Sequence, residues 1–165
     1  MTEKVWKWFW VWDFEKEEKW LQKMADEGWA LCRAGFCNYT FEKCEPGEYN
    51  IRLEMRSSDS SYQEFLEEIG AEDVGQVFKW SYYRRKSELG EFDLFSDIDS
   101  RLEHLHRISW TLKMVGFANI MIGIGNSLGN RFGWINLLCG CLLMYGLGRI
   151  NAKEEVLEEE RKLRE

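Results

Sequence analysis

The sequence has little of the material from which metal and redox sites are built. It contains two histidines, His104 and His106, which on a helix would point to different sides because they lie two positions apart. Its five cysteines are Cys32, Cys37, Cys44, Cys139 and Cys141. No two of them have the CxxC spacing that is typical of zinc sites. We therefore expect no metal, no cofactor and free thiols instead of disulfides.

Catalytic arrangements are missing from the sequence as well. It has no glycine-rich phosphate loop, and no nucleophile is spaced with a base and an orienting group. Acidic pairs such as Glu17 with Glu18 fall where helices are expected to begin, and acids there complement the helix dipole. The sequence thus predicts no catalytic residue and no enzyme activity. An enzyme of unknown reaction is the alternative, which a measured turnover would establish.

Positive charge is the third shortage. The chain has 22 Lys and Arg residues against 29 Asp and Glu residues, a formal net charge of −7. Because a nucleic acid requires a basic face, we expect no nucleic-acid partner. The single proline, Pro46, and the lack of low-complexity tracts leave no predicted linker. The N-terminal stretch is charged and aromatic and does not resemble a secretory signal, so we expect this part in the cytosol.

The sequence does have a long apolar stretch. Residues 114 to 148 carry one charge, Arg131. Two transmembrane helices fit here, over about 108–127 and 132–149, although each charge-free run is near the lower limit for crossing about 30 Å of hydrocarbon. A connecting helix over 96–112 would precede them, and a charged tail over 150–165 would follow as an exposed helix. The alternative is a soluble helical hairpin buried in a dimer.

The charges around this stretch predict its orientation. Basic residues gather before the first span and after the second, and only Arg131 lies between the two spans. The positive-inside rule then places both termini in the cytoplasm, as in a multi-pass protein of the cell membrane. Gly116 and Gly123 share one face of the first helix, and Gly133 and Gly140 share one face of the second. Such small residues would allow close approach of the backbones, within the hairpin or between protomers.

The first 95 residues are predicted to form an α+β domain. Alternating apolar residues predict strands over 5–12, 31–42, 49–56 and 77–86. Helices are predicted from Asp13 to a stop at Gly28 and over 61–70. The turn signal of Pro46 and Gly47 suggests that the second and third strands form a hairpin. This βαββαβ order predicts a ferredoxin-like sandwich, in which both helices cover one face of a four-stranded antiparallel sheet.

The first predicted strand carries tryptophan at every second position. The four residues are Trp6, Trp8, Trp10 and Trp12. One interpretation places them on the open face of the sheet, interleaved with three arginines, Arg52, Arg56 and Arg84. The other places them in the core beneath the helices. We favour the open face because the alternative would bury Lys7, and we take these seven residues as the predicted binding residues.

Three stretches of the chain resemble a known bacterial family. They are "KWFWVWDFEKEEKWLQKMADEGWALCRAGFCNYTFEKCEPGEYNIRLEM", "VGQVFKWSYYRRK" and "ELGEFDLFSDIDSRLEHLHRI". In order and spacing they are similar to domain of unknown function 2812 over about residues 4 to 108. The resemblance implies C-terminal membrane helices and a gene neighbourhood with a PadR-type transcriptional regulator. It implies no activity, cofactor or catalytic residue.

These observations predict a membrane-anchored binding or regulatory module. Four indoles in a row exceed the apolar patch that a monomer usually exposes, so a protein partner or a second copy of the chain is expected to cover them. The gene neighbourhood implied by the family makes a PadR-type regulator a reasonable partner. The alternative is a sensor that holds an amphiphilic or cationic small molecule over the indoles.

Overall fold

A computed structural model describes residues 2–56, 60–95, 97–127, 129 and 132–164. The chain divides into two compact units, Met1–Ser96 and Asp97–Glu165. The first unit contains β1 (Thr2–Trp6), η1 (Val11–Asp13), α1 (Phe14–Asp26), β2 (Trp29–Gly35), β3 (Asn38–Lys43), β4 (Tyr49–Met55), α2 (Ser60–Glu68), β5 (Ala71–Val77), β6 (Trp80–Lys86) and η2 (Ser87–Leu89). The second contains α3 (Ile98–Ser127) and α4 (Gly133–Arg164). The α+β class and the two long C-terminal helices agree with the sequence prediction.

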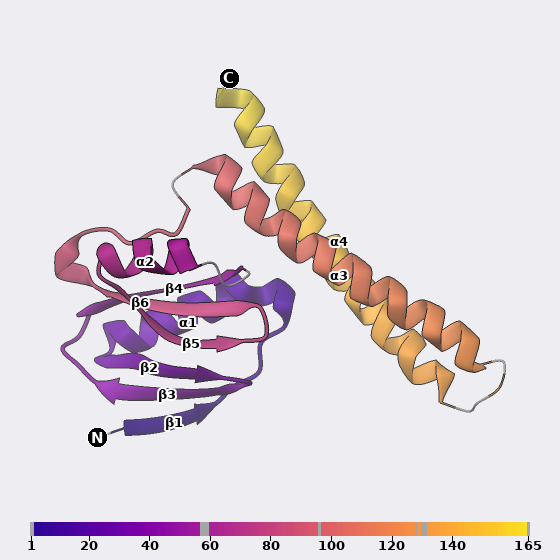
Figure 1. Cartoon of the computed structure of the whole chain (residues 1–165), viewed down its shortest axis with the longest axis horizontal. Coiled ribbons are helices and arrows are strands. Elements are labelled where there is room, and N and C mark those ends of the chain that lie inside the picture. Colours follow the sequence, from indigo (N-terminus) through magenta and orange to yellow (C-terminus); the bar gives the residue numbers. More distant parts are fainter. Residues whose placement is uncertain (1, 57–59, 96, 128, 130–131, 165) are drawn as a thin grey trace. The chain divides into compact units, whose positions relative to one another are not determined.

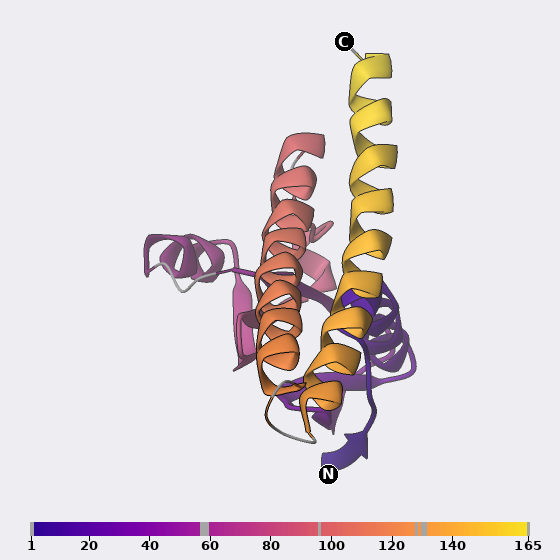
Figure 2. The same cartoon turned by 90° about the vertical axis from the view of Figure 1, so that its right-hand side faces the viewer.

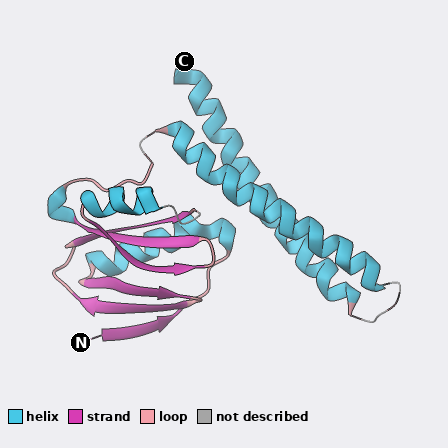
Figure 3. Cartoon of the chain, in the orientation of Figure 1, coloured by secondary structure: helices cyan, strands magenta, loops and turns pink. Residues whose placement is uncertain are grey.

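The first unit is built from two halves with the same element order. Each half consists of a strand, a helix and a hairpin, and each forms a three-stranded antiparallel sheet: β1-β3-β2 in the first half and β4-β6-β5 in the second (Figures 1 and 3). Both halves have a register shift in the strand after the helix, between Leu31 and Arg33 in β2 and between Asp73 and Gly75 in β5. The helix stops also match, because Gly28 and Gly70 have φ values of 86° and 82°.

The two sheets meet along β2 and β5, which contact each other and point the same way in Figure 1. Gly75 makes this approach possible, since a Cβ atom there would lie 2.7 Å from the Ala34 carbonyl oxygen. The parallel direction brings the turns that follow the two strands to the same end of the unit. The two turns carry the exposed side chains of Phe36 and Phe78.

The two helices cover opposite faces of the second sheet. Consecutive residues of a strand point to opposite faces. On β6, the Tyr82 hydroxyl bonds to Glu17 of α1, whereas Tyr83 packs with Leu66 of α2. The buried side chains of α1, among them Leu21, follow the spacing of an amphipathic helix.

Helix α1 also closes the outer edge of β4. The Gln22 side chain donates to the Tyr49 carbonyl oxygen at 3.1 Å and accepts from the Ile51 amide at 2.9 Å. The Glu18 carboxylate accepts from the Leu53 amide at 3.1 Å. These bonds satisfy backbone groups that an edge strand would otherwise offer to another chain.

The strand order of a ferredoxin-like sandwich is not confirmed. The predicted strand over 31–42 is the hairpin of β2 and β3, and most of β5 lies before the predicted strand over 77–86. Both hairpins turn over two residues without a glycine or proline in the turn, so the usual turn residues are missing there. The predicted hairpin between 31–42 and 49–56 is also not formed, because β3 and β4 belong to different sheets.

The second unit is a pair of long helices that lie side by side in two views (Figures 1 and 2). The predicted connecting helix and first span form one continuous helix, α3, and the second span continues into the tail as α4. The glycine prediction is confirmed. A Cβ atom on Gly123 would lie 2.7 Å from Leu137, and one on Gly140 would lie 2.6 Å from Ile120.

Candidate functional site

The tryptophan-rich stretch leaves the sheet halfway along. β1 ends at Trp6, the chain is still extended at Trp10, and Val11 begins a turn of 3₁₀ helix. Alternation therefore keeps Trp6, Trp8 and Trp10 outward, with exposed fractions of 76%, 55% and 40%. The helical turn directs Trp12 inward, where it is 4% exposed. The structure thus places three of the four predicted tryptophans on the surface and the fourth in the core.

Two phenylalanines extend this surface, and the second of them, Phe78, lies on the other half of the unit. The Trp8 ring lies 5.3 Å from the Trp10 ring and 5.8 Å from that of Phe36, in the turn between β2 and β3. The Phe36 ring lies 5.9 Å from Phe78, in the turn between β5 and β6. We call the four residues Trp8, Trp10, Phe36 and Phe78 the aromatic ridge. Its rings are continuous, and Trp10 stacks on the buried Trp12 at 5.0 Å.

Phe78, at the outer end of the aromatic ridge, has a backbone conformation that is unfavourable for a bulky residue. Phe78 has a φ of 55° and an exposed fraction of 83%. Positive φ at the first residue of a two-residue turn strongly favours glycine, and it is unusual for a bulky side chain. The ring also forgoes the roughly 1.5–3 kcal/mol that full burial of a phenylalanine contributes. Neither the strained backbone nor the exposed ring of Phe78 contributes to the stability of the fold.

The sequence pattern does not single out Phe36 or Phe78. Phe36 falls in the middle of the predicted strand over 31–42 and Phe78 at the start of the one over 77–86, where alternation gives neither a special place. A repeated pattern was available, because "GFCN" and "VFKW" follow the two helix-stop glycines at the same distance. Aligning the two halves would have put both phenylalanines in equivalent turns.

The predicted arginines lie away from the aromatic ridge. The Arg52 Nη1 atom lies 3.4 Å from Gln22 Oε1 on α1. The Arg56 guanidinium carbon lies 3.7 Å from the centre of the Tyr62 ring on α2. These contacts hold the two helices against β4 and its C-terminal end, so both arginines have structural partners.

Arg84 joins the two sheets. Its Nε atom lies 2.7 Å from Glu72 on β5, and its Nη1 atom lies 2.5 Å from Glu42 on β3. Nη1 also donates to the Leu31 carbonyl oxygen on β2 at 3.2 Å. Burial lowers the pKa of the guanidinium, but the bonds to the two carboxylates outweigh this and leave the pKa above its usual value. Arg84 is therefore a fixed cation at the junction and is not available to an indole.

A buried carboxylate lies between the two halves. Glu17 of α1 is 8% exposed, and its Oε1 atom accepts from the hydroxyls of Tyr39 on β3 at 2.6 Å and Tyr82 on β6 at 2.7 Å. Burial raises the pKa of Glu17, and the two hydroxyl bonds oppose this rise. Burial also raises the pKa of both tyrosines, with the Glu17 charge as a further cause, so both remain donors.

Aromatic rings and a lysine extend outward from Tyr39, one of the two tyrosines that bond to this carboxylate. The Trp20 ring lies 5.1 Å from the Tyr39 ring and 5.6 Å from Phe9. The Lys7 ammonium lies 4.3 Å from the centre of the Trp20 ring. Rings of this kind attract cations. Among the residues that the structure describes, no group of His, Cys, Asp and Glu side chains could hold a metal ion.

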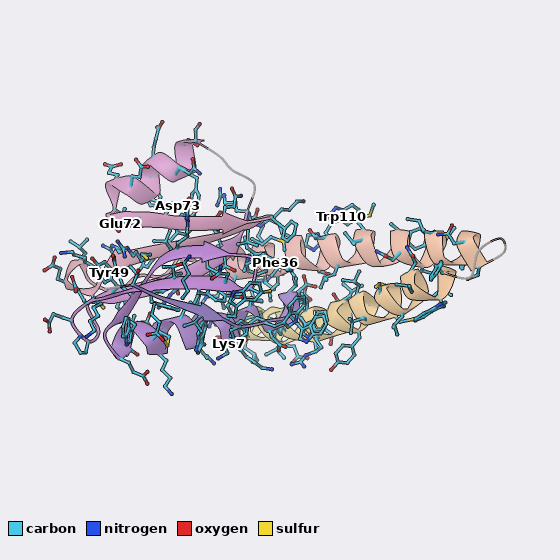
Figure 4. The ribbon with its side chains drawn as sticks, turned by 90° about the horizontal axis from the view of Figure 1, so that it is seen from below. Lys7, Phe36, Tyr49, Glu72, Asp73 and Trp110 are labelled. Atoms are coloured by element: carbon cyan, nitrogen blue, oxygen red, sulfur yellow. The ribbon has the colours of Figure 1, made fainter. Side chains whose placement is uncertain are left out.

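Figure 4 shows where several of these residues lie along the strands. Lys7 and Phe36 lie toward one end of the strands, and Tyr49 and Glu72 lie toward the other. Phe36 of the aromatic ridge is therefore separated along the strands from Glu72, one of the carboxylates that hold Arg84. A negatively charged surface that contacts the ridge at Phe36 would thus lie away from Glu72.

Comparison with known proteins identifies the family and nothing beyond it. No curated protein and no solved structure matches the chain. The model of a family described as "Protein of unknown function (DUF2812)" matches residues 13–118, which is more than half of the chain. The match includes Phe36, Phe78 and the buried Glu17, and it begins just after Trp12. The chain therefore belongs to the DUF2812 family.

Proposed function

We propose that this protein is a membrane-anchored regulatory module that recruits a protein partner through the aromatic ridge. The observation that carries the proposal is Phe78, which is almost fully exposed in a turn conformation that disfavours it. Three further rings continue from it without a gap. Aromatic anchors of this kind dominate the binding energy of protein interfaces.

The anchor in this proposal is the pair α3 and α4. Both helices are long and apolar enough to cross a membrane. Only 28% of the most apolar stretch of each helix is buried within the chain, and large side chains such as Phe117, Ile124 and Leu138 are exposed. Lipid would cover these side chains. The proposed location is the cell membrane with both termini in the cytoplasm, as the distribution of basic residues favours.

The anchor is tested separately from the ridge. The full-length chain should stay with host membranes after an alkaline wash. Tags at both termini should react with a labelling reagent only after the cells are permeabilised. A chain that is released as a soluble dimer would favour the alternative of a buried helical hairpin and would refute the anchor.

Recruitment is tested by native mass spectrometry of full-length protein extracted gently from its host membranes. We expect a co-purifying protein, for which a PadR-type regulator is the first expectation, and loss of this protein with Trp8→Ala. Truncation of an anchoring tryptophan costs about 2 kcal/mol, or roughly 30-fold in affinity. The matched control is Phe65→Ala, since Phe65 is a 52% exposed aromatic residue on α2, outside the aromatic ridge. Equal retention in both variants would refute the proposal.

A second function is supported by a different observation. Glu17 has two tyrosine hydroxyls on one oxygen, and the neighbouring Trp20 ring already holds the Lys7 ammonium. A carboxylate beside aromatic rings is suited to an organic cation, so a sensor of cationic or amphiphilic molecules is the alternative. Titration with a tetraalkylammonium ion should quench tryptophan fluorescence in the native chain and not in Glu17→Gln. No quenching in the native chain would remove this alternative.

A further inference from the structure

The aromatic ridge has a local charge opposite to that of the chain. The three segments that build it are residues 4–12, 33–40 and 74–81. They contain four basic residues, Lys4, Lys7, Arg33 and Lys79, all exposed, and no Asp or Glu. The chain as a whole carries −7. Lys7 lies on the other side of the first segment, with its ammonium over the Trp20 ring. Lys4, Arg33 and Lys79 remain as the exposed basic residues of the segments that carry the ridge, in a protein that is otherwise acidic.

The chemistry of this surface is that of a bilayer interface. Tryptophan and phenylalanine are favoured at the boundary between headgroups and acyl chains. Lysine and arginine are attracted to anionic headgroups, with a gain of about fivefold in binding for each residue near the surface. Phe78, 83% exposed at the tip of a turn and followed by Lys79, combines both properties.

We infer that the anionic surface of the membrane is the resting occupant of the aromatic ridge. This inference rests on the proposed function, because α3 and α4 would keep the first unit within reach of a bilayer. A ridge that lies in the headgroup region is closed to a protein. Membrane docking would therefore regulate recruitment, and the partner would bind when the ridge leaves the bilayer.

The test uses photo-crosslinking of the full chain in vesicles of defined composition. Benzoylphenylalanine replaces Phe78 or, as a control, Phe65, and the chain is reconstituted in phosphatidylcholine with or without phosphatidylglycerol. We expect phospholipid adducts at position 78 in the anionic vesicles, several-fold above those at position 65. The adducts should fall about fivefold for each lysine removed by Lys4→Gln and Lys79→Gln. Lys16→Gln and Lys23→Gln, which change exposed lysines of α1, should leave them unchanged.

Equal adduct yields at positions 78 and 65 would overturn the inference, as would protein–protein adducts at position 78 in place of lipid adducts. These results are distinct from a failure of the anchor. If the anchor fails, the chain is washed off the vesicles at alkaline pH. If only the inference fails, the chain stays with the vesicles and position 78 does not reach the lipid.

Discussion

Phe78 has an exposed ring and a backbone conformation that a bulky residue rarely adopts. A left-handed conformation costs a bulky residue about 1–2 kcal/mol, and a glycine adopts it freely. Because the ring is exposed, its removal takes little from the core. We therefore expect Phe78→Gly to raise the free energy of unfolding by about 1 kcal/mol or leave it unchanged, measured by denaturant unfolding. A loss of 2 kcal/mol or more would mean that the ring is structural.

Glu17 predicts a dependence of stability on pH. Burial raises its pKa above the usual 4.5, so the folded protein binds this proton more tightly than the unfolded chain does. The stability due to protonated Glu17 is complete below pH 4.5 and is lost as the pH rises through the folded-state pKa. Glu17→Gln removes this contribution. The difference in free energy of unfolding, native minus variant, should therefore fall with rising pH, by at most about 1.4 kcal/mol per pH unit.

The measurement is denaturant unfolding of both proteins from pH 4 upward. Taking the difference cancels other titrating groups, including Glu18, whose pKa is also raised by burial. A difference that stays constant over the whole range would show that Glu17 titrates alike in the folded and unfolded chain.

The sequence allowed the exposure of some residues of the site to be predicted, but not that of others. The exposure of Trp6, Trp8 and Trp10 followed from alternation, because an extended chain keeps every second side chain on one side. The burial of Trp12 could not be predicted from alternation, because one turn of 3₁₀ helix directs its side chain inward. Partners distant in sequence, such as the carboxylates that hold Arg84, have no sequence signal at all.

At the scale of elements, α1 protects the edge of β4. Gln22→Ala removes both of its backbone bonds, and a buried group left without a partner costs about 1–3 kcal/mol. We expect a loss of stability in this range and, because the edge is opened, faster aggregation. Thermal unfolding with light scattering measures both effects. Lys19→Ala, at an exposed position on the same helix, is the control, and an equal effect of the two changes would contradict the role of Gln22.

The glycines of α3 provide a second test at this scale. A Cβ on Gly123 would lie 2.9 Å from the Leu137 amide nitrogen, whereas one on Gly125 meets nothing within 4 Å. Gly123→Ala should destabilise the helix pair by about 1–3 kcal/mol, and Gly125→Ala should leave it unchanged or slightly more stable. Unfolding in detergent, followed by circular dichroism, compares the two. Equal stability of the variants would contradict close packing at Gly123.

Elements with strong local signals were predictable, and their assembly was not. The first helix was expected from Asp13 to Gly28 and is observed as Phe14–Asp26, because its amphipathic spacing and glycine stop are local. The hairpin turns at Phe36 and Phe78 were missed, since residues atypical of turns occupy them. Without these turns, six strands were counted as four, and the duplicated arrangement could not be derived.

At the scale of the whole molecule, one chain combines an acidic α+β domain, which carries the aromatic ridge, with two apolar helices. Each part has a plain structural role alone, as a folded domain or as a helix pair. In the proposed function, the two helices would confine the module to a membrane and the aromatic ridge would be its binding surface.

The central claim, that the aromatic ridge binds a partner, is tested most directly by photo-crosslinking in living host cells. Benzoylphenylalanine is placed at position 36, 78 or 65 of the full-length chain, and the adducts are separated and identified. The account predicts the same protein adduct at positions 36 and 78, together with the lipid adducts of the resting state, and no such protein adduct at position 65. Absence of that protein at positions 36 and 78, or its equal capture at position 65, would contradict the claim.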